Sequence, residues 1–271
     1  MNGAQMTPTE RANTALSKST FTADTETPIL EVRNASRHFG KFRALSNVSV
    51  SFKSHELTAI IGPNGAGKST FFNVISGGLA PTSGQVLFEG RDISDIAAHE
   101  FARIGIAKSF QITNVFKELS AHENVRVALQ MQITKFELWR SRASYKSLIE
   151  EADVLLDRVG LLNERSKCAA DLAHGQQRSL EVAMALACHP KLLLMDEPTA
   201  GMSPEETKVM MDLIKELAQE RTVILVEHKM KMVMGLCNRL IVLHHGELLA
   251  EGTPEQIRNN AEVKRVYLGQ H

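Results

Sequence analysis

One short segment restricts the possible folds of this chain more than any other part of its sequence. It reads Gly62-Pro63-Asn64-Gly65-Ala66-Gly67-Lys68-Ser69-Thr70 and matches the P-loop pattern G-x-x-x-x-G-K-S/T. The apolar run Leu57 to Ile61 precedes it and predicts a buried strand, and Phe71 to Ile75 predicts the opening of a helix. A strand, a glycine-rich loop and a helix in this order are the setting in which the motif binds phosphate.

The residue types of this loop fit the binding of a nucleoside triphosphate. Its glycines allow several backbone N–H groups to point inward at phosphate oxygens, and the following helix adds the positive end of its dipole. Lys68 can reach the β- and γ-phosphates, and the hydroxyl of Ser69 can hold Mg²⁺. A chance glycine-rich turn is the weaker interpretation, because the flanking strand and helix are correctly placed. The loop alone does not indicate how the triphosphate is used.

Composition excludes several classes of protein. The 271 residues include 31 basic and 31 acidic side chains, so nothing indicates a nucleic-acid partner. Three scattered cysteines favour neither a disulfide framework nor a metal site. No stretch approaches the roughly 18 apolar residues of a membrane span. Residues 1–28 lack the apolar core of a secretory signal, and their Thr, Ser, Ala and Asn content predicts a disordered extension.

The remaining pattern, residues 29–271, predicts an α/β domain. Strands are expected first at Ile29 to Arg33, Val48 to Phe52 and Gln85 to Glu89. From about residue 93 to 187 the helical period dominates and indicates an inserted helical subdomain; in this range Leu148, Ala152, Leu155 and Val159 share one helix face. Buried strands then alternate with helices, and the expected ranges are Leu192 to Met195, Pro204 to Glu220, Thr222 to Val226, Leu240 to Leu243 and Pro254 to Leu268. In the helix Pro204 to Glu220, the residues expected to face inward are Val209, Met210, Leu213, Ile214 and Leu217. We find no internal repeat, so the sequence predicts a single nucleotide-binding core.

A second motif adds two carboxylates. Leu192 to Met195 is followed directly by Asp196 and Glu197, which is a Walker B pattern. Asp196 can coordinate Mg²⁺, often through water, and Glu197 can act as general base for an attacking water. An ordinary strand that ends in charged loop residues is the alternative, and the nearby P-loop disfavours it. His228 follows the strand Thr222 to Val226, but a single histidine is more often structural, and Gln111 is a weak signal alone.

Taken together, these segments resemble the ATP-binding subunit of ABC transporters. The P-loop, Ser109-Phe110-Gln111, Leu172-Ala173-His174-Gly175-Gln176-Gln177-Arg178, Asp196-Glu197-Pro198-Thr199 and Glu227-His228 occur in the order and at the spacing of that family. The resemblance covers about residues 29–271. It implies a P-loop NTPase core of the ABC ATPase type, with an antiparallel β subdomain and an inserted helical subdomain, and it implies ATP and Mg²⁺ as cofactors.

The resemblance also implies a role for each matching residue. Phe39 would stack on adenine, and Gln111 would touch Mg²⁺ and water and report to the membrane partner. The signature segment 172–176 would contact the γ-phosphate bound by the opposite subunit, through Ala173, Gly175 and Gln176. Asp196 and Glu197 match the Mg²⁺ ligand and the catalytic base, and His228 matches the switch histidine.

Two departures from the family pattern concern contacts across the subunits. The signature usually reads Leu-Ser-Gly-Gly-Gln, so Ala173 lacks a hydroxyl donor and His174 replaces a glycine. Ser203 stands where the D-loop usually carries Asp. Because the N–H of Gly175, the P-loop and Glu197 remain, hydrolysis is still expected. We interpret His174 as a solvent-exposed loop residue.

The departures themselves resemble one subfamily, the ATP-binding subunits of branched-chain and hydrophobic amino-acid uptake systems. Urea and amide importers and the lipopolysaccharide-export ATPase share much of the pattern and stay open as alternatives. The resemblance implies integral-membrane permeases, a second ATP-binding subunit and, indirectly, an extracytoplasmic solute-binding protein as partners. It implies peripheral attachment at the cytoplasmic face of the inner membrane, with Ile112 to Leu119 receiving a permease helix.

Three other classes of protein fit less well. A GTPase would need an Asn-Lys-x-Asp guanine reader, which the sequence lacks. A small-molecule kinase would not need the signature segment. A soluble ABC-type ATPase of translation or DNA repair usually carries two nucleotide cores or a long coiled coil, and neither is found in this sequence.

Overall fold

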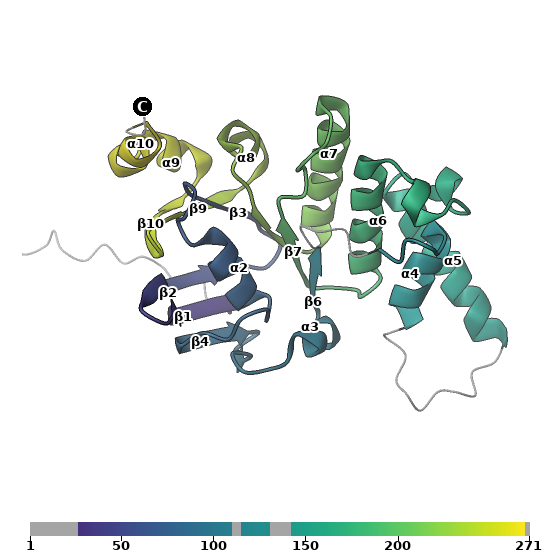
Figure 1. The fold of residues 1–271 in the computed structure, drawn as a ribbon, viewed down its shortest axis with the longest axis horizontal. Coiled ribbons are helices and arrows are strands. Elements are labelled where there is room, and N and C mark those ends of the chain that lie inside the picture. Colours follow the sequence, from purple (N-terminus) through teal and green to yellow (C-terminus); the bar gives the residue numbers. More distant parts are fainter. Residues whose placement is uncertain (1–26, 110–114, 131–141, 269–271) are drawn as a thin grey trace, which may run out of the picture.

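A computed structural model describes residues 27–109, 115–130 and 142–268. Its centre is a six-stranded sheet in the order β10-β9-β3-β8-β7-β6 (Figure 1). Five strands are mutually parallel and β10 is antiparallel; their bounds are β3 (Leu57–Ile61), β6 (Ile106–Ser109), β7 (Leu192–Asp196), β8 (Thr222–Val226), β9 (Arg239–His244) and β10 (Glu247–Gly252). The loops that follow β3, β7 and β8 therefore meet at one edge of the sheet.

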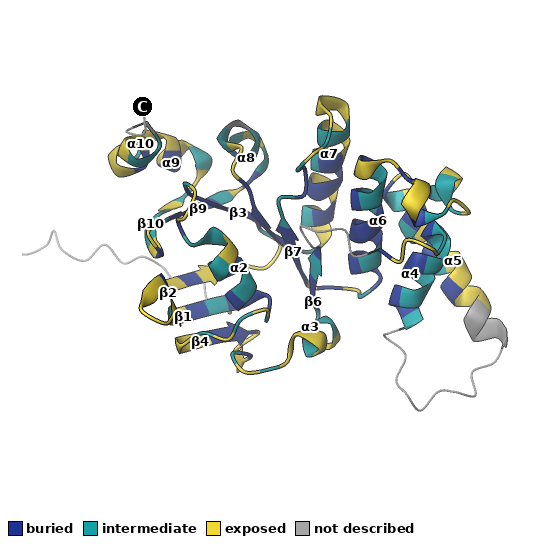
Figure 2. Ribbon diagram, in the orientation of Figure 1, coloured by how far each residue is buried: buried dark blue, intermediate teal, exposed yellow. Residues whose placement is uncertain are grey.

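The central strands are buried on both faces, as Figure 2 shows in dark blue. Alternate residues of each strand enter two different apolar cores: Val223 and Leu225 join one, and Ile224 and Val226 join the other. The near-continuous apolar runs in the sequence follow from this double burial, because a parallel sheet covered on both faces has no solvated side.

A second, antiparallel sheet has the order β2-β1-β4-β5. Its strands are β1 (Leu30–Phe39), β2 (Phe42–Phe52), β4 (Ser83–Phe88) and β5 (Arg91–Asp92). Val48, Val50 and Phe52 of β2 are buried and Ser49 and Ser51 are exposed, so this part of β2 has one buried and one solvated face. The first two strands are longer than predicted and form one extended hairpin.

Helices cover the two sheets. Their bounds are α2 (Lys68–Ile75), α3 (Ala98–Ile104), α4 (Ala121–Gln130), α5 (Arg142–Arg158), α6 (His174–Leu186), α7 (Pro204–Glu220), α8 (Met230–Leu236), α9 (Pro254–Asn259) and α10 (Ala261–Leu268), with 3-10 turns η1 (Leu162–Glu164) and η2 (Ala169–Asp171). In Figure 1, α4, α5 and α6 gather at one end of the molecule, and α9 and α10 lie at the other. None of the helices in the described ranges is long and apolar enough to cross a membrane.

The region 93–187, expected to be the inserted helical subdomain, also contains a core strand. β6 pairs in parallel with β7 from Ile106↔Leu192 to Ser109↔Met195, so this short segment belongs to the central sheet. Its signal is weak in the sequence because it has only four residues and Lys108 interrupts its apolar character.

Two predictions about helices are wrong. Val209 was expected to face inward from α7, but its side chain is 65 % exposed, because it lies one residue outside the stripe Met210, Leu213, Ile214 and Leu217. The expected helix from Pro254 to Leu268 is two helices. Asn260 has an extended backbone, and its Oδ1 accepts the N–H groups of Glu262 and Val263, so it ends α9 and caps α10.

Candidate nucleotide-binding site

The P-loop joins β3 to α2 in a conformation that needs its glycines. Gly65 and Gly67 have φ angles of 78° and 96°, in the left-handed region. A Cβ atom at Gly67 would lie 2.7 Å from the carbonyl oxygen of Ala44, and one at Gly62 would lie 2.3 Å from that of Leu243. The loop is thus packed against the neighbouring backbone, and only glycine fits at these two positions.

The remaining loop residues lie around the start of α2. Asn64 and Ser69 are exposed, Pro63 and Thr70 are partly exposed, and Ala66 is buried. Gly67 is the N-cap residue of α2 and has no side chain that could accept the N–H groups of the first turn. A helix terminus of this kind suits an anion.

Lys68 lies folded against the loop. Its Nζ donates to the carbonyl oxygens of Gly62 at 2.8 Å and Pro63 at 3.0 Å. Burial lowers the pKa of the Lys68 ammonium below its usual value, and the carboxylates of Glu197 and Asp196 oppose this shift. The lysine therefore lies within electrostatic reach of the two acids predicted from the Walker B pattern.

Asp196 ends β7 opposite Val226 of β8. Burial raises the pKa of the Asp196 carboxyl above its usual value, while Lys108 acts in the opposite direction. Together with the hydroxyl of Ser69, Asp196 fits the sparse protein ligation of Mg²⁺, which keeps several waters and binds one or two carboxylates plus substrate phosphates. The described ranges contain no group of three or more His, Cys, Asp or Glu side chains that could hold a metal ion.

Lys108 is a residue near this site that the sequence did not reveal. From β6 its Nζ donates to Asn73 Oδ1 at 3.0 Å and Ser76 Oγ at 3.3 Å, and it lies 4.8 Å from the centre of the Phe72 ring. Burial lowers the pKa of its ammonium and Asp196 opposes that shift. The one available signal was a lysine inside an otherwise apolar run.

Glu197 and His228 form a pair at the same edge of the sheet. His228 Nδ1 lies 3.4 Å from Glu197 Oε1, and both side chains retain some contact with solvent. Glu197 has φ 46°, which is uncommon for a residue with a side chain. Its N–H donates to Val226 O at 3.0 Å, so the end of β8 holds the turn in which the carboxylate lies. A carboxylate beside an imidazole can accept a proton from water.

The signature segment lies at the start of α6 and packs on the segment that precedes α7. The N–H of Ala173 donates to Gln176 Oε1 at 3.0 Å. A Cβ atom at Gly175 would lie 2.3 Å from Glu206 Oε1, so the Glu206 side chain would have to move for any larger residue there. His174 is exposed as expected, but it is the first residue of α6 instead of a loop residue, and its ring contacts Gly201.

Phe39 ends β1 with 45 % of its surface exposed, which leaves an aromatic face for a base to stack on. Phe42 is its cross-strand neighbour and is 66 % exposed. The guanidinium of Arg37 lies 4.9 Å from the centre of the Phe39 ring. Gln111, predicted as a metal and water contact, lies outside the described residues.

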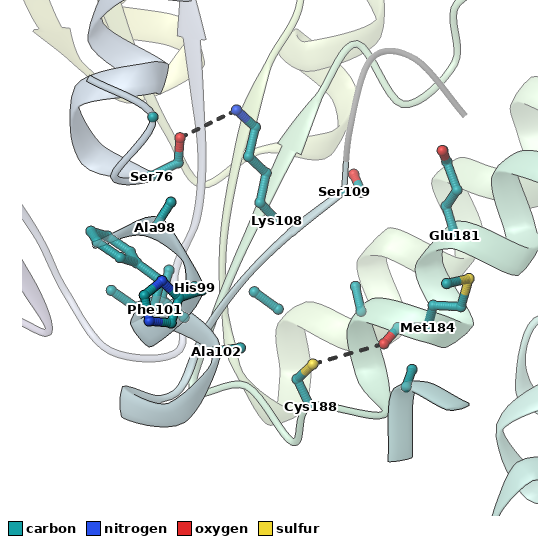
Figure 3. A pocket seen from close by; sticks show the side chains of 15 residues that line it. Ser76, Ala98, His99, Phe101, Ala102, Lys108, Ser109, Glu181, Met184 and Cys188 are labelled. Atoms are coloured by element: carbon teal, nitrogen blue, oxygen red, sulfur yellow. Dashed lines mark hydrogen bonds between the residues drawn. The ribbon is translucent and has the colours of Figure 1, made fainter. Parts of the chain in front are cut away.

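A largely apolar cavity of about 360 Å³ lies between the end of α2, α3 and β6 on one side and α4 and α6 on the other. Figure 3 shows Phe101, Met184 and Cys188 around it, with Lys108 reaching from the cavity to Ser76. Lys108, which lines this cavity, also lowers the pKa of the Asp196 carboxyl electrostatically.

Comparisons with known proteins agree with this geometry. A family model described as ABC transporter matches residues 45–200, and a second, described as branched-chain amino acid ATP-binding cassette transporter, matches residues 247–271. The chain belongs to the ABC transporter family. The high-affinity branched-chain amino acid transport ATP-binding protein LivG of Escherichia coli strain K12 is 39% identical to this ABC ATPase over 252 residues, which cover 90% of the chain and 98% of LivG. BraF of Pseudomonas aeruginosa, which carries the same description, is 39% identical over 251 residues, again 90% of the chain and 98% of the relative.

Solved structures confirm the predicted fold. An ATP-binding cassette of an ABC transporter in its ADP conformation superposes on this ABC ATPase with a TM-score of 0.78 at 29% identity, covering 90% of the chain and all of the cassette. The family prediction and the prediction of an ATP-hydrolysing transporter subunit are likewise confirmed.

Proposed function

We propose that this ABC ATPase powers an importer of branched-chain or related amino acids, as a peripheral subunit at the cytoplasmic face of the inner membrane. The observation that carries the proposal is the match of residues 247–271 to a model described for branched-chain amino acid cassettes. That segment lies outside the P-loop and Walker B motifs, so it reports on the subfamily and not on ATP binding in general. The 39% identity to LivG and BraF supports the same choice over a urea, amide or lipopolysaccharide system.

In this proposal ATP lies across the edge formed by β3, β7 and β8. Phe39 stacks on the adenine, and the P-loop residues Gly62 to Thr70 surround the phosphates with backbone N–H groups. Lys68 leaves its carbonyl partners for the β- and γ-phosphates. Ser69, Asp196 and Gln111 would hold Mg²⁺, which would neutralise charge on the phosphate oxygens.

Glu197 is the proposed general base. It accepts a proton from the water that attacks the γ-phosphorus, while the bond from that phosphorus to the ADP oxygen breaks. His228, 3.4 Å away through Nδ1, keeps the carboxylate oriented and adds a donor near the developing charge. The left-handed backbone at Glu197 is the kind of local strain found at reactive residues.

A second ATP-binding subunit completes the site. The start of α6, with Ala173, Gly175 and Gln176, would face the γ-phosphate held by that subunit, where the helix dipole favours an anion. Closure then depends on contacts that exist only with ATP bound between the subunits, and hydrolysis removes them.

The permease is proposed to dock at the apolar cavity between α3 and α6. A cytoplasmic helix with an apolar side chain would fill it and would contact Lys108, which links the cavity to Asp196. Of the predicted docking segment Ile112 to Leu119, the first three residues lie outside the described residues, and Phe116 is 50 % exposed. The solute-binding protein acts on the permease from the other side of the membrane.

Uptake by intact cells tests the solute. In a host that lacks the gene, uptake of radiolabelled leucine, isoleucine and valine should fall, and wild-type protein should restore it. The Glu197→Gln variant, at equal protein level, should not restore it. Unchanged amino-acid uptake together with lost urea uptake would refute this proposal and favour the urea importer.

A further inference from the structure

Glu227 is a buried acid that the proposed chemistry does not use. Its surface is only 1 % exposed, and it follows β8 directly. Burying a carboxylate costs free energy unless its oxygens receive hydrogen bonds. Both do: Thr199 Oγ1 donates to Oε1 at 2.9 Å, and the backbone N–H of His228 donates to Oε2 at 3.2 Å.

The two donors belong to the segments that follow two different strands, β7 and β8. Thr199 is itself completely buried and lies two residues after Glu197. His228 supplies the imidazole that faces Glu197. The side chain of Glu227 is therefore a bridge between the turn that carries the proposed base and the residue that carries its partner.

The backbone of Glu227 adds a third connection. Its N–H donates to Ile60 O of β3 at 3.2 Å, two residues before the P-loop begins. The neighbouring carbonyl of Val226 accepts the N–H of Glu197 at 3.0 Å. The three segments that would hold phosphate, base and histidine thus meet at one residue.

The imidazole has a defined direction in this arrangement. Nδ1 of His228 faces two carboxylates, with Glu197 Oε1 at 3.4 Å and Glu227 Oε2 at 4.0 Å. The Nδ1 side of the imidazole therefore faces both the proposed base and the buried acid Glu227.

We propose that Glu227 is a positioning residue, which through Thr199 and the N–H of His228 sets the distance between Glu197 and His228. The inference rests on the proposed roles of those two residues. Substituting a residue that only stabilised the fold would lower the melting temperature, but it would not lower kcat selectively over the affinity for ATP. Substituting a positioning residue lowers kcat while the affinity for ATP is kept.

The test uses the full-length chain and an isosteric change. Thr199→Val removes the hydroxyl that donates to Glu227 but keeps the side-chain volume. We expect kcat for ATP hydrolysis to fall about ten- to hundredfold, with the Kd for Mg²⁺–ATP, measured by calorimetry, within about twofold of wild type. Thr199→Ser keeps the hydroxyl and should restore most of kcat. Should Thr199→Val not fold, Glu227→Gln takes its place in the same assay.

A matched control is available in β3. Thr58 is also completely buried, and within the described ranges its hydroxyl has no hydrogen-bond partner. Thr58→Val therefore makes the same chemical change without breaking a hydrogen bond and should leave kcat unchanged.

A second control adds each substitution to His228→Ala. In that background the loss of kcat caused by Thr199→Val should largely disappear, because the effects of residues that act through one another are not additive.

Unchanged kcat in Thr199→Val and Glu227→Gln would overturn the inference, and so would a full additional loss in the His228→Ala background. Failure of the proposed function is a different result, since Glu197→Gln and His228→Ala would then hydrolyse ATP at the wild-type rate.

Discussion

Asp196 is a residue whose charge opposes folding. Burial raises the pKa of its carboxyl, with Lys108 only partly offsetting the effect. The folded chain therefore binds this proton more tightly than the unfolded chain does. This tighter proton binding stabilises the folded chain. The stabilisation is fully present below the pKa of Asp196 in the unfolded chain and is lost as pH rises through its raised pKa in the folded chain. Above this range the ionised carboxylate lowers the free energy of unfolding.

Asp196→Asn should consequently raise the melting temperature at pH 7 in Mg²⁺-free buffer, because the amide removes the buried charge. The difference from wild type should shrink as pH is lowered toward the range in which wild-type Asp196 is protonated. Thermal unfolding followed by circular dichroism at several pH values measures this, and ATP hydrolysis should be lost in the same variant. A melting temperature at or below that of wild type at pH 7 would contradict it.

Gly175 is constrained by packing, since its φ angle lies outside the left-handed region. In Gly175→Ala the new Cβ would displace the Glu206 side chain, which receives the N–H of Ser203 in the capping box of α7. We expect a loss of about 1 kcal/mol in the free energy of unfolding. Urea unfolding measures the loss.

The control for this substitution is Gly235→Ala in α8, where a Cβ meets nothing within 4 Å. Alanine at an unhindered helical position should stabilise the fold by about 0.5–1 kcal/mol. Equal effects of the two substitutions would show that Glu206 does not restrict the signature helix.

At the scale of elements, α4 is tied to the loop before it by one buried side chain. Asn124 is completely buried, and its Nδ2 donates to the carbonyl oxygens of Phe116, Leu119 and Ser120 at 3.0, 3.3 and 2.9 Å. Its Oδ1 accepts the N–H of Phe116 at 2.7 Å. These bonds fix the described part of the proposed docking segment against the helical subdomain.

Asn124→Ala should reduce the free energy of unfolding by about 2–3 kcal/mol, because buried backbone groups lose their partners. Urea unfolding with an unchanged m-value is the expected result. Asn259→Ala, at an exposed position at the end of α9, is the control and should stay within about 0.5 kcal/mol of wild type. A loss at Asn124 as small as that of the control would mean that the loop is held by other contacts.

The sequence predicts helices correctly where a hydrophobic stripe repeats over several turns. It fails where one residue decides which way a side chain faces or where a helix ends. The stripe Met210, Leu213, Ile214 and Leu217 of α7 was found, but Val209 was assigned to it wrongly, because an apolar residue beside a stripe does not show which side it faces. The break between α9 and α10 depends on one side-chain cap at Asn260, which does not alter the hydrophobic period.

At the scale of the whole molecule, a parallel sheet assembles the site from distant segments. Lys68 and His228 follow β3 and β8, and Asp196 ends β7; these strands are neighbours in the order β3-β8-β7. Motifs and the family resemblance predicted these residues. Lys108 and Glu227 could not be predicted in the same way, because their importance arises from β6 lying beside β7 and from β8 lying between β3 and β7.

The most direct test of the account is a single-turnover measurement of ATP hydrolysis, with the Kd for ATP measured in parallel, for wild type and Glu197→Gln. Since Glu197 is assigned as the base beside His228, Glu197→Gln should lower the hydrolysis rate by about two to four orders of magnitude. Its Kd for ATP should stay within about threefold of wild type. A Glu197→Gln protein that hydrolyses ATP at the wild-type rate would contradict the account.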